Sequence, residues 1–123
     1  MDTGKKQNRW RRLLRRGANL LKRSGWVSGY NFGRSDTNTP IPEGKTTFDV
    51  ADKFCMVGAI RKVAGVRDPN GIYEGTTCNK EYNKAIHAIL AKFPECHGRV
   101  YRLNDGSDKE TVIAKMLEVA NGD

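Results

Sequence analysis

The chain has 123 residues, of which 37% are hydrophobic and 29% charged, and its net charge is +8 at pH 7. This length suffices for one domain with its own core, and the composition is that of a globular protein rather than a disordered or fibrous one. The apolar runs fall well short of the roughly 20 residues that a membrane-spanning helix needs, so we expect no transmembrane segment. No signal-peptide pattern follows the basic N-terminus, so we expect a cytoplasmic protein.

The positive charge is concentrated at the N-terminal end. Residues 1–35 contain ten basic residues and one acidic residue, a net charge of +9, whereas residues 36–123 have a net charge of −1. Such asymmetry is typical of a segment that binds an anionic partner. We expect residues 1–6 to form a basic tail and residues 7–121 to form a single helical domain.

The sequence predicts a first amphipathic helix over Gln7–Lys22. Its apolar residues fall on one arc at 100° per residue: Trp10, Leu13, Leu14, Gly17, Ala18, Leu20 and Leu21. Its basic residues fall on the opposite arc: Arg9, Arg11, Arg12, Arg15, Arg16, Lys22 and Arg23. We expect the apolar arc to lie in the core and the basic arc to face solvent.

A Gly-, Pro- and Thr-rich segment over residues 27–50 follows and is predicted to be a loop. It can contain a minor irregular hairpin around Trp26–Phe32 and Thr46–Val50. A second helix is predicted to start at Asp49 or Asp52, either of which can cap it, and to end at Ala64.

Two more amphipathic helices are predicted towards the C-terminus. One starts at Thr77 or Asn79 and stops before Pro94. The segment Val100–Leu103 is predicted to be extended, Asn104-Asp105-Gly106 is typical of a tight turn, and Ser107 with Glu110 resembles a capping box for the last helix. Four short amphipathic helices indicate a single, mainly α domain.

The three cysteines, Cys55, Cys78 and Cys96, form no evident disulfide framework or zinc motif, because no close cysteine pair occurs. We therefore expect reduced thiols, no metal and no cofactor. Cys55 near the start of a helix, with His87 and Asp105 downstream, permits the hypothesis of a thiol-dependent hydrolase or transferase. His97 and Asn104 are alternative partners. The competing interpretation, which we prefer, is that Cys55 is a small buried residue between helices.

The basic arc of the first helix is the strongest functional signal. It can neutralise phosphates in a salt-dependent manner that is independent of sequence, or contact an acidic protein face. An amphipathic helix on an anionic membrane is a third interpretation.

Three motifs resemble a family of short proteins of bacteria and their phages that is designated a domain of unknown function. They are a helix followed by Gly25-Trp26, a C-x-x-G-A segment at Cys55–Ala59, and Asn104-Asp105 with Thr111. The resemblance spans residues 10–121 and implies no activity. We expect a non-catalytic accessory protein, encoded by a phage and placed in the host cytoplasm. Its partner would be a host protein or, without sequence specificity, nucleic acid.

Overall fold

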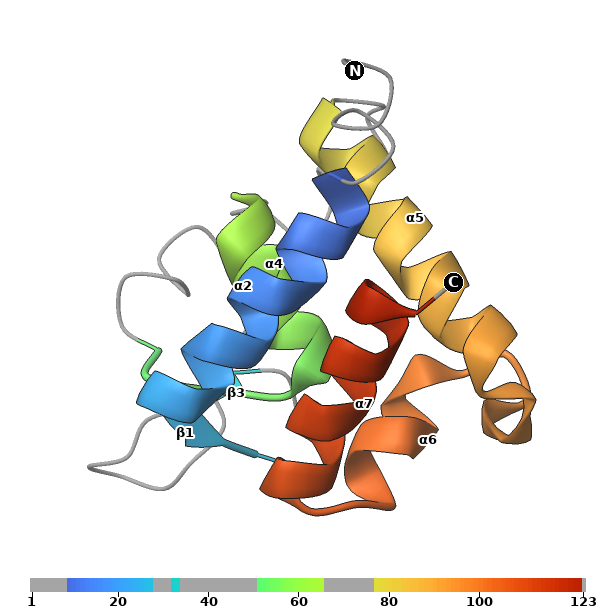
Figure 1. The fold of residues 1–123 in the computed structure, drawn as a ribbon. Coiled ribbons are helices and arrows are strands. Elements are labelled where there is room, and N and C mark those ends of the chain that lie inside the picture. Colours follow the sequence, from blue (N-terminus) through green and yellow to red (C-terminus); the bar gives the residue numbers. More distant parts are fainter. Residues whose placement is uncertain (1–8, 28–31, 34–50, 66–76, 123) are drawn as a thin grey trace.

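The computed structural model describes residues 9–27, 32–33, 51–65 and 77–122, and it shows a single, mainly helical domain (Figure 1). The predicted 1–6 tail and almost all of the 27–50 loop lie outside the described residues. The helices are α2 (Arg9–Arg23), α4 (Met56–Ala64), α5 (Thr77–Lys92), the 3₁₀ turn η2 (Pro94–Cys96), α6 (Val100–Asp105) and α7 (Lys109–Asn121).

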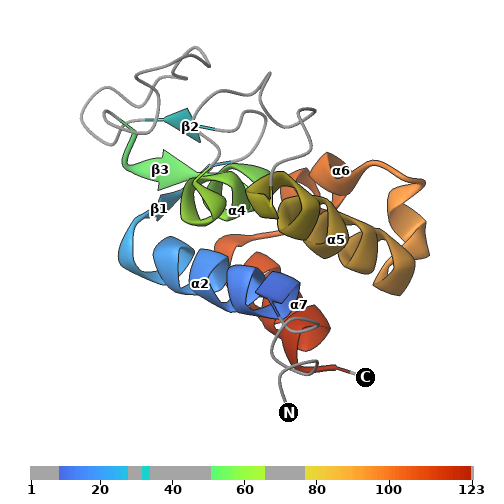
Figure 2. The same cartoon turned by 90° about the horizontal axis from the view of Figure 1, so that it is seen from above.

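Helix α2 packs against α4, α5 and α7, so the N-terminal and C-terminal helices lie side by side (Figures 1 and 2). Leu13, Leu14 and Leu21 are buried, which confirms that the apolar arc of this helix lies in the core. The helix ends at Arg23, one residue after the predicted end at Lys22, and the predicted start at Gln7 lies outside the described residues. Because α2 contributes only one side to the core, its opposite side is left to solvent.

Gly17 sets how closely the neighbouring helices approach α2. A Cβ atom built on this glycine would lie 3.0 Å from Met116 Cε of α7 and 3.4 Å from Ile60 Cγ1 of α4. The absence of a side chain therefore lets both helices pack onto the same turn of α2.

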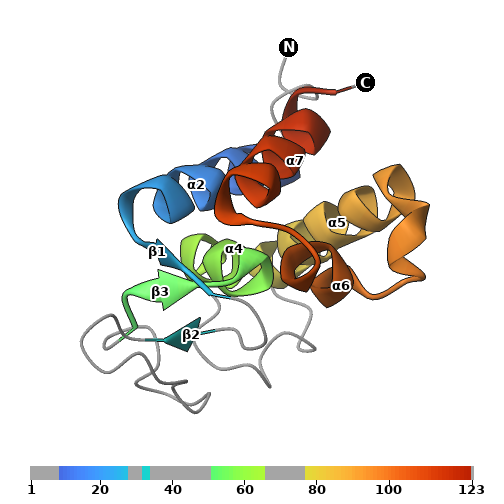
Figure 3. The same ribbon diagram turned by 90° about the horizontal axis from the view of Figure 1, so that it is seen from below.

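A small sheet lies at one end of the helical layer (Figure 3). Strand β3 (Lys53–Phe54) pairs in parallel with β1 (Gly25–Trp26) and antiparallel with β2 (Phe32–Gly33). The third strand is thus Lys53–Phe54, and the predicted partner Thr46–Val50 lies outside the described residues.

Helix α4 begins later than predicted, because Cys55 rather than Asp49 or Asp52 is its N-cap. Asp52 instead precedes β3, where its backbone N–H donates to the carbonyl of Gly33 at 3.0 Å. Gly65 ends the helix in the left-handed conformation, with φ of 80°, as its position after Ala64 predicts.

The segment Val100–Leu103 is helical, so its predicted extended conformation is wrong. Its β-branched and aromatic residues favour a strand locally, but α6 forms here and buries Leu103 in the core. Asn104 and Asp105 are consequently the last residues of α6 rather than a turn.

Helix α7 is capped by Asp108, not by the predicted Ser107. The Asp108 carboxylate accepts a hydrogen bond from the backbone N–H of Thr111 at 2.8 Å. The hydrogen bond from the Thr111 side chain and, second, this backbone bond lower the pKa of the exposed Asp108 carboxyl. The helix then buries Val112, Met116 and Val119 against the other helices.

Candidate functional site

The basic arc predicted on the first helix divides into two groups in the structure. One group has exposed side chains and consists of Arg9, Arg12, Arg16, Lys22 and Arg23. The other group, Arg11 and Arg15, is engaged with α7. The predicted set of seven therefore consists of five exposed cations and of two arginines, the half-buried Arg11 and the exposed Arg15, that are hydrogen-bonded to α7.

Arg11 and Arg15 hold the C-terminal end of α7. Arg15 Nη2 donates to the carbonyl of Ala120 at 3.1 Å, and Arg15 Nε donates to Asn121 Oδ1 at 3.0 Å. Arg11 Nη1 donates to the carbonyls of Ala120 and Gly122. The last carbonyls of a helix have no partner within it and carry partial negative charge, so guanidinium groups stabilise them.

The exposed cations border a groove between α2 and α4, which we call the α2–α4 groove. It consists of two adjoining hollows that share Arg16 and Val63. The first, the Leu13 hollow, has a volume of about 270 Å³ and is lined by Arg9, Arg12, Leu13, Arg16, Val63, Ala64 and Glu81. The second, the Lys22 hollow, has a volume of about 560 Å³ and is lined by Arg16, Asn19, Lys22, Arg23 and Val63.

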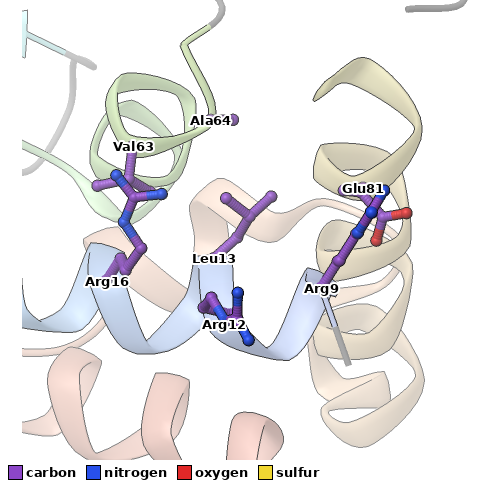
Figure 4. A pocket seen from close by; sticks show the side chains of 7 residues that line it. All are labelled: Arg9, Arg12, Leu13, Arg16, Val63, Ala64 and Glu81. Carbon is purple, nitrogen blue, oxygen red and sulfur yellow. The ribbon is translucent and has the colours of Figure 1, made fainter. Parts of the chain in front are cut away.

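Figure 4 shows how three helices contribute to the Leu13 hollow. Leu13 of α2 points between the helices towards the end of α4, where Val63 and Ala64 lie. The long side chain of Arg9 extends towards Glu81 of α5. The hollow therefore has an aliphatic floor and a charged rim.

Glu81 of α5 is the acidic residue among the described residues that line the Leu13 hollow. Its Oε1 atom accepts from Lys84 Nζ at 3.5 Å, and its side chain is 13% exposed. The other carboxylate oxygen is buried and has no hydrogen-bond donor among the described residues. Sequence reasoning missed Glu81 because it belongs to a helix distant in the chain.

Cys55, the predicted candidate nucleophile, is buried in the structure. Its sulfur accepts a hydrogen bond from the backbone N–H of Gly58 at 3.3 Å, which makes it the N-cap of α4. Burial raises the pKa of the thiol to about 11, and the hydrogen bonds from Gly58 and Val57 only partly oppose this shift. Because the thiolate is the reactive form, this thiol is a weak nucleophile at neutral pH.

Asp105 and His87, the two residues predicted to assist Cys55, are both exposed. Asp105 is exposed at the end of α6, and its charge contributes to the raised pKa of Cys55. His87 is exposed on α5, away from the apolar side of that helix, as its spacing predicts. His97, the alternative, adopts a left-handed conformation with φ of 54° after η2 and is also exposed.

Asn104 is buried, with 1% of its surface exposed, and joins three segments. Its Oδ1 atom accepts from Trp26 Nε1 at 2.8 Å and from the backbone N–H of Met56 at 2.9 Å. Its Nδ2 atom donates to the carbonyl of Val27 at 3.0 Å and to Asp105 Oδ1 at 3.1 Å. The three motifs that carry the family resemblance therefore meet at one structural contact.

Two properties of the described residues bear on the remaining interpretations. Nowhere in the described ranges do three or more His, Cys, Asp or Glu side chains gather in a way that could hold a metal ion. The described helices include none with the length and apolar character to span a bilayer. Leu13, Leu14 and Leu21 of α2 are buried in the core, so these three leucines are not available to enter a membrane surface.

Comparison with known proteins identifies the family of the chain. No match was found among the curated proteins or among the solved structures. The sequence model of one family matches residues 5–121, which is nearly the whole chain. The chain therefore belongs to the family of unknown function DUF6197.

Proposed function

We propose that this protein acts without catalysis, by binding an acidic surface of a partner protein through the exposed cations of α2 and the α2–α4 groove. We also propose that it works in the cytoplasm, as a phage-encoded accessory protein in the host cell. The observation that carries the proposal is the exposed row of Arg9, Arg12, Arg16, Lys22 and Arg23 on a helix whose other side is fixed in the core.

Because α2 is held in place by the fold, its exposed cations are suited to binding a partner and not only to keeping the protein soluble. Its apolar side packs into the core and its neighbours Arg11 and Arg15 are bonded to α7, so the backbone that carries the exposed cations is held in place. Arg9, Arg12 and Arg16 lie three or four residues apart, on one face of the helix. Guanidinium groups arranged in this way suit bidentate contacts with carboxylates or phosphates.

The aliphatic floor of the groove favours a protein partner over a nucleic-acid backbone. Leu13, Val63 and Ala64 offer apolar surface between the cations, which suits an apolar side chain. Glu81 repels any anion at this place, which disfavours a continuous chain of phosphates but not a protein that places an apolar side chain there. A nucleic-acid backbone engages cations chiefly through charge and gains little from such a floor.

The test compares acidic protein and nucleic acid as ligands of the same surface. Fluorescence anisotropy is measured with labelled poly-L-glutamate, duplex DNA and single-stranded RNA at about 50 and 200 mM salt, a range over which phosphate contacts weaken strongly. We expect measurable, salt-dependent binding of poly-L-glutamate and its loss in the variant Arg12→Glu with Arg16→Glu. Binding of DNA or RNA in preference to poly-L-glutamate would overturn the choice of partner. If none of the three ligands binds, the proposal is overturned.

The matched control is Arg99→Glu with Arg102→Glu, which makes the same change in net charge at the N-cap of α6 and within that helix. Both side chains are exposed, and Arg99 contacts the hydroxyl of the exposed Tyr101 at 3.5 Å. We expect this variant to retain most of the binding. An equal loss in both variants would show attraction by net charge rather than by the α2 surface.

A further inference from the structure

We infer that the Leu13 hollow binds one aliphatic side chain of the partner, which we call the anchor. The acidic residues of the partner lie on one side of the anchor only, along the Lys22 hollow. This inference rests on the proposed function and adds to it a ligand class: a short acidic segment with an aliphatic anchor at one end. The observations behind it are the floor, the volume and the distribution of charge in the groove.

The floor and volume of the Leu13 hollow suit one apolar side chain. Leu13, Val63 and Ala64 form its aliphatic part, and its volume of about 270 Å³ is below the roughly 300 Å³ at which small-molecule sites begin. Buried anchors in a pocket, surrounded by polar contacts, are the usual source of affinity in protein interfaces. Arg12 and Arg16 supply those polar contacts at the rim.

The charges of the groove are not evenly distributed along α2. The Leu13 hollow contains Glu81 together with its arginines, whereas the described residues that line the Lys22 hollow include Lys22 and Arg23 and no acid. A carboxylate of the partner placed beside Glu81 meets a like charge, while one placed beside Lys22 and Arg23 does not. The acidic residues of the segment should therefore extend from the anchor in one direction only.

Synthetic peptides test this arrangement directly. The probes are fluorescein-labelled pentapeptides with one leucine and four aspartates, with leucine first, last or central. We expect one terminal arrangement to bind at least about threefold more tightly than the central one, because only it keeps every aspartate away from Glu81. Equal binding of all three would overturn the inferred direction. In the variant Glu81→Gln we expect the difference between the arrangements to disappear.

A double-mutant cycle tests the anchor. The leucine of the better peptide is replaced by alanine, and Val63 of the protein by serine, separately and together. Each single change should weaken binding by on the order of tenfold. The two changes together should weaken it little more than either one alone, because both remove the same contact. The matched control is Val100→Ser, a half-buried valine on α6. Independent effects of the two changes, or no effect of either, would overturn the anchor.

The outcomes separate this inference from the proposed function. If aspartate-rich peptides bind through Arg12 and Arg16 but the leucine contributes nothing, the proposed function stands and the anchor is wrong. If the peptides fail and single-stranded RNA or duplex DNA binds instead, both are wrong. Circular dichroism of Val63→Ser and Glu81→Gln should match that of the unmodified protein, and the peptide measurements are compared between folded proteins only.

Discussion

Trp26 donates the N–H of its indole to the side-chain oxygen of Asn104, at 2.8 Å, across 78 positions of sequence. The same oxygen accepts from the backbone N–H of Met56 at 2.9 Å. One buried amide thus holds the end of β1, the start of α4 and the end of α6 together. A polar group at 1% exposure is stable here because each of its hydrogen-bonding atoms has a partner.

We predict that Asn104→Ala destabilises the protein by about 2–4 kcal/mol. The change leaves the indole N–H of Trp26, the N–H of Met56 and the carbonyl of Val27 without their partner, and an orphaned buried group costs about 1–3 kcal/mol. The measurement is urea unfolding followed by circular dichroism. The matched control is Asn19→Ala, an exposed asparagine on α2, which should change the stability by less than about 0.5 kcal/mol. A loss below about 1 kcal/mol for Asn104→Ala would contradict this role.

We predict that Cys55 makes the stability fall in alkaline solution. Its pKa is about 11 in the folded protein, against an ordinary value of 9.0, so the unfolded chain releases the proton first as the pH rises. The contribution of Cys55 is therefore fully present below about pH 9 and is lost between pH 9 and 11. The loss amounts to roughly 2–3 kcal/mol, because two pKa units correspond to about 2.7 kcal/mol.

The measurement is the free energy of unfolding from urea titrations at pH 7, 9, 10 and 11. Other groups also titrate in this range, so the test is the difference between the unmodified protein and Cys55→Ser, which keeps a small capping side chain. The two curves should converge by about 2–3 kcal/mol as the pH rises. Parallel curves would show that the thiol is not desolvated. Rapid iodoacetamide labelling of Cys55 at pH 7 in the folded protein would contradict the raised pKa as well.

The helices could be predicted from sequence where their amphipathic pattern is strong. The arcs of α2 are separated clearly enough to place Leu13, Leu14 and Leu21 in the core. The short α6 could not be found in the same way, because six residues carry less than two turns of pattern and Val100 and Tyr101 favour strands. Tertiary burial of Leu103 and Asn104 decides the conformation there.

Only the part of the candidate site that α2 contributes could be predicted from the sequence. The cations of α2 are visible in the sequence, but nothing in it separates Arg11 and Arg15, which are hydrogen-bonded to α7, from Arg12 and Arg16, which border the α2–α4 groove. That distinction depends on where the end of α7 lies. The groove depends on side chains from three helices, so its floor and its acidic residue emerge only from the packing.

We predict that Arg11 and Arg15 stabilise the fold, while Arg12 and Arg16 do not. Arg11→Ala and Arg15→Ala each remove hydrogen bonds to the end of α7 and should cost about 1 kcal/mol, the ordinary value for a partly exposed bond. Arg12→Ala and Arg16→Ala, matched in chemistry and helix, should change the stability by less than about 0.5 kcal/mol. Urea unfolding distinguishes the pairs. Equal losses in the two pairs would mean that the contacts with α7 contribute nothing specific.

Gly17 gives the last prediction, because a Cβ atom built there would lie 3.0 Å from Met116 Cε of α7. We predict that Gly17→Val destabilises the protein by about 1–3 kcal/mol, since the new side chain overlaps Met116 and Ile60, and overpacking of a filled core is costly. The control is Gly17→Val with Met116→Ala: removing the Met116 side chain provides room, so the double variant should lose less than the sum of the single changes. Thermal unfolding measures the differences. Strict additivity would show that Gly17 does not determine how closely α7 packs.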